Sequence, residues 1–133
     1  MTSKVTYEGE LRTRCIHLNS GNEFITDAPL DNNGKAEAFS PTDTVATALA
    51  SCMFTIMGIK ARGMEVNLEG ATAKVTKIMA ADPRRISKII IDFEFPHPVN
   101  EKNRHILENA AKNCPVIYSL HPDIEKQVAF HWK

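Results

Sequence analysis

The sequence predicts an α+β protein in which an antiparallel sheet packs against one long, buried helix. Three features of its 133 residues support this fold class. Segments of alternating apolar and polar residues, typical of half-buried strands, occur near both ends and in the middle of the chain. Residues 41–62 are apolar at helical spacing on nearly every side. A second helical segment precedes the last strand, so the elements do not follow the regular alternation of a parallel α/β protein.

The first strands are predicted in residues 4–18, "KVTYEGELRTRCIHL", with a turn near Gly9. The next segment, "SGNEFITD", reads as a turn and a short strand. "APLDNNGKAEAFS" is rich in turn-forming residues and is predicted to be a polar loop. The first third of the chain is therefore expected to consist of short strands followed by a loop.

The long helix has clear start and stop signals. Ser40 is a good N-cap, and Pro41 suits the first helical position because its missing N–H would be unpaired there. Asp43 follows three residues after Ser40, which is close to a capping box and favourable for the helix dipole. Gly63 is the expected C-terminal stop.

This helix has almost no polar face, and a helix that is apolar on every side must be buried on every side. One small sheet can cover only one side of it, and a chain of 133 residues has little else to cover the rest. We therefore expect a homodimer in which two copies of the helix pack together.

Two strands are predicted after the helix. Residues 65–79 alternate well enough for a strand with a bend at Gly70, and "AADPRR" is a turn. The segment "ISKIIIDFEF" alternates as a half-buried antiparallel strand does. Its predicted inward residues are Ile89, Ile91, Phe93 and Phe95.

The last part of the chain predicts a helix, a break and a strand. "EKNRHILENAAKN" forms the helix, with Asn100 as its N-cap. Pro115 disfavours helical geometry at Cys114, so the helix should break there, and "PVIYSL" can restart as a short helical turn. "DIEKQVAFHW" closes the chain as a strand. Its predicted inward residues are Val128, Phe130 and Trp132.

Length and composition indicate one domain, residues 1–133, of an ordinary globular protein. The formal net charge is zero, so nothing favours binding to the phosphate backbone of a nucleic acid. The N-terminus has no apolar run that would form a secretory signal. Residues 45–59 are judged too short to cross a membrane. We expect a cytoplasmic protein without a nucleic-acid or membrane partner.

Three cysteines, an odd number, imply no disulfide framework. Periodicity favours packing for Cys52 inside the long helix, with a reactive thiol as the alternative. Cys114 lies at the expected helix break, where unpaired N–H groups would lower the pKa of its thiol; the alternative is a plain capping residue. Cys15 and His17 share one strand face, but no second pair has ligand spacing, so a packed cysteine is favoured over a metal site.

A thiol in the middle of a helix has no helix terminus to ionise it. If Cys52 is reactive, it therefore needs a cation from elsewhere in the structure. Arg12 and Arg14, in the second predicted strand, are the candidates, because a guanidinium stays charged even in a dry pocket. The alternative is that both arginines are ordinary exposed strand residues.

The segments "SPTDTVATALASCM" and "AAKNCPVIYSL" surround Cys52 and Cys114. Both resemble motifs of the OsmC/Ohr family (osmotically inducible protein C and organic hydroperoxide resistance protein). The resemblance extends to "YEGELRTRCIHLNSGNEFITDAP" and to the two strands between the helices. It implies an α+β fold that forms an intertwined homodimer, with two long helices back to back in the middle.

The resemblance also implies thiol-dependent peroxidase chemistry, with no metal or other cofactor. Cys52 would be the peroxidatic cysteine, whose thiolate attacks a peroxide oxygen and becomes a sulfenic acid. Cys114 would be the resolving cysteine that condenses with it to a disulfide, and an external dithiol would reduce that disulfide. The expected substrates are organic hydroperoxides, in a role in oxidative-stress defence.

In this family an arginine from the N-terminal strands and a glutamate at the helix start together poise the thiolate. The resemblance places the arginine at Arg12 rather than Arg14. The position of the glutamate is occupied by Thr42, and Asp43 comes next, so Asp43 is the carboxylate available at the helix start. This departure places the sequence nearer the broader OsmC-like branch than the Ohr branch.

Four apolar residues crowd Cys52 along the helix and are predicted to line a substrate site: Met53, Phe54, Ile56 and Met57. Such a site favours alkyl or aryl hydroperoxides over hydrogen peroxide, because the apolar tail leaves water on binding. The alternative function is a non-catalytic module that binds a small apolar molecule in a cavity at the dimer interface. The missing glutamate supports that alternative.

Overall fold

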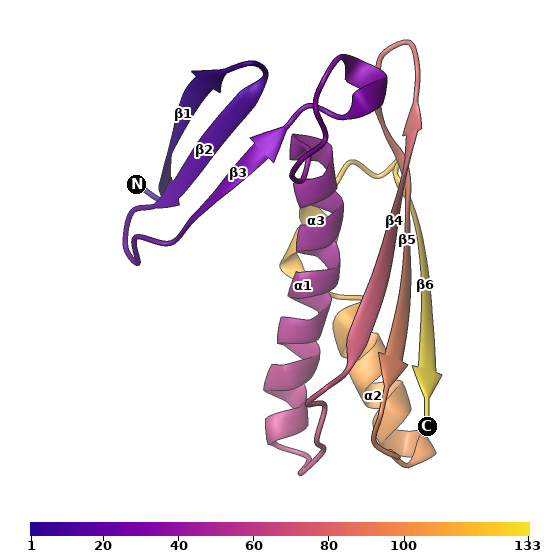
Figure 1. Ribbon diagram of the computed structural model, residues 1–133. Coiled ribbons are helices and arrows are strands. Elements are labelled where there is room, and N and C mark those ends of the chain that lie inside the picture. Colours follow the sequence, from indigo (N-terminus) through magenta and orange to yellow (C-terminus); the bar gives the residue numbers. More distant parts are fainter. The chain divides into compact units, whose positions relative to one another are not determined.

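The computed structural model describes all 133 residues, which form two compact units, Met1–Val45 and Ala46–Lys133. We call these the N-terminal unit and the C-terminal unit. The elements in chain order are β1 (Ser3–Gly9), β2 (Arg12–His17), β3 (Glu23–Asp27), the short 3₁₀ helix η1 (Leu30–Asn32), α1 (Pro41–Arg62), β4 (Thr72–Ala80), β5 (Arg85–Phe95), α2 (Glu101–Ala111), α3 (Pro115–Ser119) and β6 (Glu125–Trp132) (Figure 1).

The N-terminal unit holds a three-stranded antiparallel sheet in the order β1-β2-β3. The predicted strands and turn are confirmed: Gly9 has a φ of 87°, a left-handed conformation that glycine adopts at little cost. Arg12 lies opposite Asp27 in the pairing of β2 with β3. This register places one cation and one carboxylate on the same face of the sheet.

The loop after β3 is held against the end of that strand. The backbone N–H of Gly34 donates to the carbonyl of Pro29 at 2.9 Å. A Cβ atom at Gly34 would lie 1.7 Å from the carbonyl oxygen of Ala28, so only glycine fits this close approach. The loop is therefore fixed at a point shortly before Glu37, whose contacts are described below.

The predicted start of α1 is confirmed. The backbone N–H of Ser40 donates to Asp43 Oδ2 at 2.9 Å, and the N–H of Asp43 donates to Ser40 Oγ at 3.0 Å. This reciprocal pair is a capping box, with aspartate in the place usually taken by glutamate. Pro41 occupies the first helical position, and the helix ends one residue before Gly63.

The C-terminal unit holds a second three-stranded sheet, in the order β4-β5-β6. β4 and β5 are antiparallel, but β5 and β6 are parallel. The predicted α+β class is confirmed, and the single antiparallel sheet predicted within it was wrong on two points. The molecule has two sheets, and the second is mixed. The helices α2 and α3 return the chain to the N-terminal end of β5. A strand that starts at that end of the sheet must run parallel to β5.

β4 begins at Thr72, later than the predicted start at residue 65. Gly70, with a φ of 85°, lies in a turn closed by the N–H of Ala71 donating to the carbonyl of Leu68 at 3.1 Å. The predicted bend at this glycine is therefore the turn that precedes the strand. The irregularity inside the strand pairing lies between Ile78 and Met79 instead.

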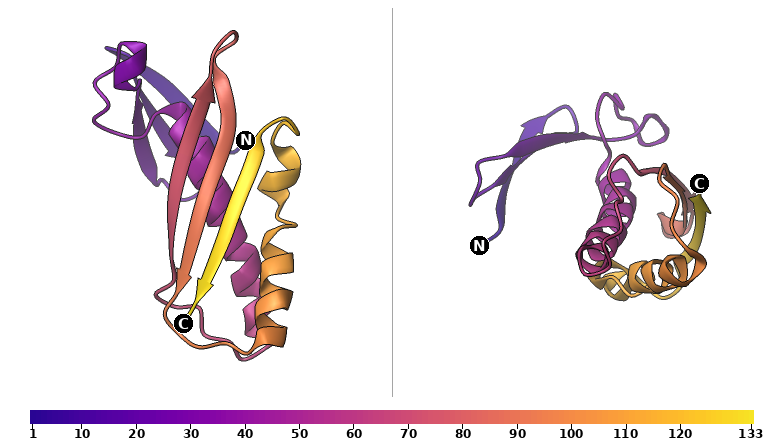
Figure 2. Two further views of the ribbon diagram at one scale, coloured as in Figure 1. Left: turned by 90° about the vertical axis from the view of Figure 1, so that its right-hand side faces the viewer. Right: turned by 90° about the horizontal axis from the view of Figure 1, so that it is seen from below.

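The core of the C-terminal unit lies between the sheet and the two longer helices, which cover the same side of the sheet (Figure 2). The predicted inward residues of β5 are confirmed as buried, and those of β6 pack against them. Phe93 and Phe130 stack with ring centroids 5.3 Å apart, and Phe95 stacks on Trp132 at 3.8 Å. This aromatic stack fixes the parallel pair in register.

One side of α1 is buried within the chain, and the opposite side is not. The buried residues repeat at helical spacing and include Leu49, Met53 and Met57. An exposed stripe follows the other side of the helix. Its middle part carries no charge and consists of Ala48, Ser51, Thr55 and Ile59, and exposed Arg62 continues it at the end of the helix. The complete burial predicted for this helix is therefore not reached within one copy of the chain.

α1 is also long and apolar enough to cross a membrane, judged by length and composition alone. The sequence analysis judged residues 45–59 alone, whereas the helix has 22 residues and extends beyond that stretch at both ends. Core helices of soluble proteins pass the same test. The buried residues of α1 belong to the core cluster that includes Ile89 and Leu107.

Candidate active site

Cys52 and Cys114 both belong to the C-terminal unit, and both are free thiols. Cys52 lies half-buried in the fourth turn of α1. Cys114 is fully buried and forms the N-cap of α3, where its Sγ accepts the backbone N–H of Ile117 at 3.4 Å. The predicted helix break and cap at this residue are confirmed. Cys52 is among the groups that act on the pKa of the Cys114 thiol.

The expected low pKa of Cys114 is wrong. Burial raises the pKa of this thiol above its usual value, and interaction with Cys52 raises it further. The N–H groups of Ile117 and Val116 act in the opposite direction but do not outweigh burial. The helix terminus has the predicted effect, whereas the dry surroundings could not be read from the local sequence. Cys114 is therefore a protonated thiol at neutral pH.

We expect iodoacetamide to modify Cys114 at pH 7 at least about tenfold more slowly in the folded protein than in urea, because only the thiolate attacks. Peptide mass spectrometry measures both rates. Because the pKa of Cys114 is higher in the folded than in the unfolded protein, the thiol adds to the free energy of unfolding at pH values below the ordinary thiol pKa of about 8.5. This stabilisation is lost as the pH rises through the pKa of the folded state. The difference between the two rates should become smaller at alkaline pH, although burial of Cys114 still slows its alkylation in the folded protein. Equal rates at pH 7 would contradict the assignment, and half-buried Cys15 serves as the internal reference.

The predicted cation Arg12 is bound by two carboxylates that the sequence analysis missed. Its Nε donates to Asp27 Oδ1 at 2.7 Å, and its Nη2 donates to Asp27 Oδ2 at 2.8 Å. Nη2 also donates to Glu37 Oε2 at 3.0 Å. The Asp27 side chain is only 1% exposed, and the hydrogen bond with Arg12 holds the pKa of its carboxyl below the usual range. Asp27 is therefore a charged, buried anchor for the guanidinium.

Arg14, the less favoured candidate, is engaged differently. Its Nε donates to Glu8 Oε2 at 3.0 Å, and its Nη1 donates to Glu23 Oε1 at 2.7 Å. Each of these carboxylates binds through one oxygen and is partly exposed, at 34% and 47%. Exposed pairs of this kind are screened by water and contribute little. Arg14 therefore matches the alternative reading, an ordinary strand arginine in surface ion pairs.

At the start of α1, Asp43 forms the capping box with Ser40, and Thr42 Oγ1 lies 3.2 Å from Ser40 Oγ. These contacts fix the first turn of the helix that carries Cys52. They show that Asp43 caps the helix, as its spacing from Ser40 indicated. They also show that the first turn is ordered by aspartate and threonine, without glutamate.

The four predicted substrate-site residues divide into two pairs. Met53 and Met57 are fully buried in the core, whereas Phe54 and Ile56 are half-buried. Phe54 packs edge-on against Phe93, with ring centroids 4.7 Å apart. Phe54 and Ile56 are therefore the two of the four with surface left to meet another molecule.

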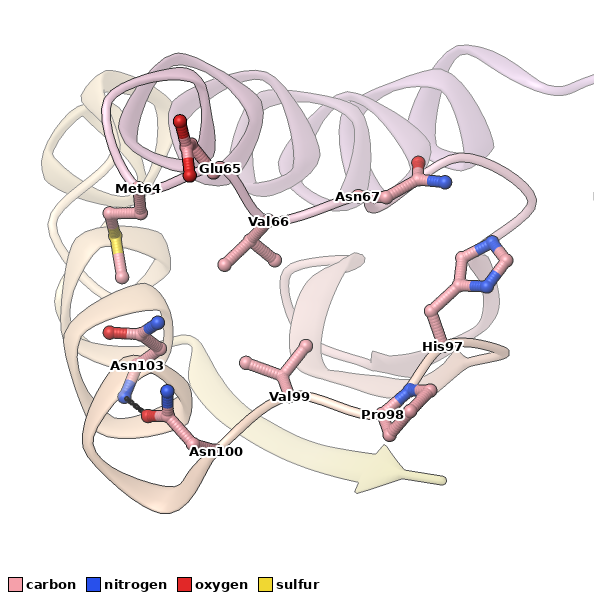
Figure 3. A pocket seen from close by; sticks show the side chains of 9 residues that line it. All are labelled: Met64, Glu65, Val66, Asn67, His97, Pro98, Val99, Asn100 and Asn103. Carbon is pink, nitrogen blue, oxygen red and sulfur yellow. Dashed lines mark hydrogen bonds between the residues drawn. The ribbon is translucent and has the colours of Figure 1, made fainter.

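A cavity of about 460 Å³ lies elsewhere in the C-terminal unit, between the loop after α1 and the loop before α2 (Figure 3). It is lined by Met64–Asn67, His97–Asn100 and Asn103, so none of the predicted site residues lines it. Asn100 Oδ1 accepts the N–H of Asn103 at 2.8 Å, which confirms the predicted cap of α2. At least one polar side chain of this cavity, Asn100, therefore serves to cap a helix.

Comparison with known proteins decides the family. A family model described as OsmC-like protein matches residues 34–128, which include both Cys52 and Cys114. The chain belongs to the OsmC-like protein family. Arg12 and Asp27 lie before the matched range, so the ion pair that they form was found from the structure. A comparison with curated proteins found no match.

Solved structures support the same OsmC-like fold. A candidate osmotic stress induced and detoxification response protein from Psychrobacter arcticus 273-4 is 60% identical, with a TM-score of 0.96 over 98% of this chain and 96% of that chain. The organic hydroperoxide resistance protein OsmC from Legionella pneumophila is 14% identical, with a TM-score of 0.76 over 98% and 97%. An OsmC like protein from Mycoplasma pneumoniae is 16% identical, with a TM-score of 0.79 over 96% and 93%. The last two likenesses concern the fold alone.

Proposed function

We propose that this OsmC-like protein is a thiol peroxidase that reduces organic hydroperoxides, with Cys52 as the attacking group and Cys114 as the resolving group. The observation that supports the proposal is that the two cysteines belong to the same unit, where Cys52 is among the groups that raise the pKa of the Cys114 thiol. A buried thiol beside a half-buried one suits a reaction in which the outer sulfur meets the substrate and the inner sulfur traps the product. The names of the Legionella relative and of a relative from Elizabethkingia anophelis, both organic hydroperoxide resistance proteins, agree with this reaction class.

The proposed reaction has three steps. The Cys52 thiolate attacks one peroxide oxygen, the O–O bond breaks, and the alkoxide leaves as an alcohol after taking a proton; sulfur is oxidised to a sulfenic acid. The Cys114 sulfur then attacks that sulfenic acid, and its thiol proton leaves with the hydroxyl as water. An external dithiol, in the reducing cytoplasm, exchanges with the disulfide and restores both thiols. The cycle needs no metal or organic cofactor.

Arg12 is proposed to face Cys52 in the assembled protein and to stabilise the thiolate. A guanidinium cannot lose its proton at physiological pH, so it supplies a fixed positive charge and several donors. Asp43 is proposed to act indirectly, by fixing the first turn of the helix that carries Cys52. On this basis Arg12→Ala slows the oxidation of Cys52, and Arg14→Ala has the smaller effect.

We expect cumene hydroperoxide to be consumed with a higher kcat/KM than hydrogen peroxide. Phe54 and Ile56 retain exposed apolar surface next to Cys52 along α1, and burying the aryl tail of a substrate there contributes about 25 cal/mol per Å². Stopped-flow assays with dihydrolipoamide as the dithiol measure both substrates. Equal or faster turnover of hydrogen peroxide would contradict an apolar substrate site.

We also propose that the protein is a homodimer in which the exposed stripe of α1 packs against the same stripe of a second copy. Ala48, Ser51 and Thr55 are small enough to let two helix backbones approach closely, and Ile59 is apolar and 63% exposed. An exposed stripe that carries no charge from Ala48 to Ile59 is unusual for a surface that faces water. A two-fold axis across this stripe would complete the burial that one copy leaves unfinished.

Ile59→Glu is expected to weaken the dimer at least about 100-fold, since an unpaired buried charge costs about 3 kcal/mol. Sedimentation velocity over a concentration series measures the dissociation constant. The matched control is Ile78→Glu, which puts the same charge at another exposed isoleucine, outside α1, and should leave the dimer intact. A wild-type chain that sediments as a monomer at micromolar concentration would overturn the proposed assembly.

The function is tested by mass spectrometry of the wild-type protein after one equivalent of cumene hydroperoxide. The expected product is a disulfide between Cys52 and Cys114, with Cys15 still a free thiol. If Cys52 remains a free thiol while the protein stays folded, the peroxidase proposal fails. The alternative of a non-catalytic binding module, which the missing helix-start glutamate supports, would then take its place.

A further inference from the structure

Tyr118 is the one exposed aromatic residue of the C-terminal unit, so burial does not explain its position. It is 71% exposed, whereas the other aromatic rings of this unit are buried or half-buried. The Tyr118 hydroxyl donates to Asn113 Oδ1 at 2.5 Å, and Asn113 Nδ2 donates to the carbonyl of Asn109 at 2.7 Å. Because Asn109 belongs to α2 and Tyr118 to α3, the amide of Asn113 ties the two helices together. We call these two hydrogen bonds the Asn113 link.

The Asn113 link spans the helix break at Cys114. α2 ends at Ala111 and α3 begins at Pro115, so the link joins the segments before and after this cysteine. With five residues α3 is too short to be stable by itself, and cysteine is not among the residues that cap a helix well. The N–H of Tyr118 donates to the carbonyl of Cys114 at 3.4 Å, longer than the usual range. The position of Cys114 therefore depends on the contacts that hold α3.

Two kinds of contact hold α3. Val116 and Ile117 are half-buried and pack against the core, whereas the Asn113 link joins residues on the exposed side. Cys52, in contrast, belongs to a helix of 22 residues whose buried side is part of the core. Of the two cysteines, Cys114 is thus the one carried by the less stable element.

Disulfide formation depends strongly on the position of Cys114. A disulfide requires the Cα atoms of its two cysteines to lie about 4.4–6.8 Å apart, with side chains directed toward each other. Holding one sulfur near this geometry in advance lowers the entropy cost of the reaction. A link that fixes the start of α3 therefore favours the reaction even though it touches neither sulfur.

We propose that Asn113 and Tyr118 are positioning residues for the resolving step: they hold the start of α3 so that the Cys114 sulfur reaches the sulfenic acid of Cys52. In this step the S–S bond forms, the S–O bond breaks, and the hydroxyl leaves as water with the Cys114 thiol proton. When the step is slow, a second hydroperoxide oxidises the sulfenic acid to a sulfinic acid and leaves as an alcohol. This inference rests on the proposed function and adds the residues that protect Cys52 from over-oxidation.

The test compares Tyr118→Phe with wild type, because this replacement removes the hydroxyl and keeps the ring. After one equivalent of cumene hydroperoxide, acid quench and peptide mass spectrometry follow the loss of the Cys52 thiol and the appearance of the disulfide. The first rate should stay within about twofold of wild type. The second should fall about three- to tenfold, the factor that one hydrogen bond contributes. With excess peroxide, the fraction of Cys52 found as sulfinic acid should rise correspondingly.

The matched control is Ser119→Ala. It removes a hydroxyl from the next residue of α3, whose hydrogen bond runs to the carbonyl of Pro115 within the same helix, at 2.9 Å. The Asn113 link stays intact, so disulfide formation should remain within about twofold of wild type. An equal loss in Ser119→Ala and Tyr118→Phe would overturn the inference, because the stability of α3 alone would then decide the rate.

A double-mutant cycle tests whether the two residues act through one link. If they do, Tyr118→Phe has no further effect on disulfide formation in the Asn113→Ala background. Asn113→Asp keeps an acceptor for Tyr118 but loses the donor to Asn109, so it should lose nearly as much rate as Asn113→Ala. An equal effect of Tyr118→Phe in both backgrounds would overturn the inference. Circular dichroism checks that each variant is folded.

A redox equilibrium tests the positioning without a peroxide. Oxidised dithiothreitol takes two hydrogen atoms from Cys52 and Cys114 by thiol–disulfide exchange, which gives the same disulfide and reduced dithiothreitol. The equilibrium constant should fall about three- to tenfold in Tyr118→Phe and stay within about twofold in Ser119→Ala. An unchanged constant in Tyr118→Phe overturns the inference whether or not peroxide reacts. Failure of the proposed function is seen separately, as a wild-type Cys52 that does not react with cumene hydroperoxide.

Discussion

Cys52→Ser is expected to abolish peroxide consumption, by about three orders of magnitude or more in kcat/KM, as loss of the nucleophile does in other enzymes. A serine hydroxyl is not ionised at neutral pH and attacks O–O bonds poorly, whereas a thiolate is a strong nucleophile. The assay follows the loss of cumene hydroperoxide with dihydrolipoamide as the reductant. Because Cys52 is half-buried and the replacement is nearly isosteric, the variant should remain folded.

The control for this experiment is Cys15→Ser, the same replacement at a cysteine in the N-terminal unit. Cys15 lies in β2, and its Sγ is 3.9 Å from Thr13 Oγ1, so serine can keep that contact. Its activity should equal that of wild type. Residual consumption in Cys52→Ser above a tenth of the wild-type rate would show that another group reacts with the peroxide.

Cys114→Ser is expected to permit one turnover and then to stall. Cys52 is still present and attacks the peroxide, but no second thiol is available to displace the hydroxyl from its sulfenic acid. Steady-state turnover should fall about tenfold or more, since only slow, direct reduction of the sulfenic acid remains. Dimedone added after one equivalent of peroxide should label Cys52, as detected by peptide mass spectrometry.

Two results would contradict the assigned roles. Unchanged steady-state turnover in Cys114→Ser would show that the disulfide lies outside the cycle. Dimedone labelling of the Cys52→Ser, Cys114→Ser double variant would show that the label comes from another residue. Loss of folding is not expected from the replacement, because serine caps a helix better than cysteine does and can accept the same N–H of Ile117.

Features set by neighbours in the sequence were predictable. The capping box of Ser40 and Asp43 depends on residues three apart, and the alternation of Ile89 and Ile91 follows from the geometry of a single strand. The break before Pro115 follows from the geometry of one dipeptide. In each case the sequence separation is small enough for one local rule to decide the outcome.

Features set by distant contacts were not predictable from the same rules. The parallel direction of β6 depends on where α2 and α3 end, which alternation within the strand does not reveal. The raised pKa of Cys114 results from residues that surround it in the core, whereas only its helix terminus was visible in the sequence. Both predictions failed for one reason: the direction of β6 and the burial of Cys114 depend on the packing of the whole C-terminal unit.

The pairing of Arg12 with Asp27 falls between these cases. The backbone N–H of His17 donates to the carbonyl of Asn22 at 2.8 Å, which closes the turn between β2 and β3. Counting outward from that turn pairs Arg12 with Asp27. The sequence therefore contained a signal for this pair, but using it required the exact position of the turn. A shift of one residue in the pairing of β2 with β3 would have placed the carboxylate of Asp27 on the other face of the sheet.

The parallel pair of β5 and β6 has a consequence for how the C-terminal unit folds. β4 and β5 are joined by a short turn and can pair early, whereas β6 arrives only after α2 and α3 have been placed. Until then β5, the central strand of the finished sheet, has one unpaired edge. Its residues Ile89, Ile91 and Phe93 do not yet have their neighbours from β6. An open, apolar edge can pair with another chain. We therefore expect the slow closing of this edge, rather than loss of the native state, to limit the yield of refolding at high protein concentration.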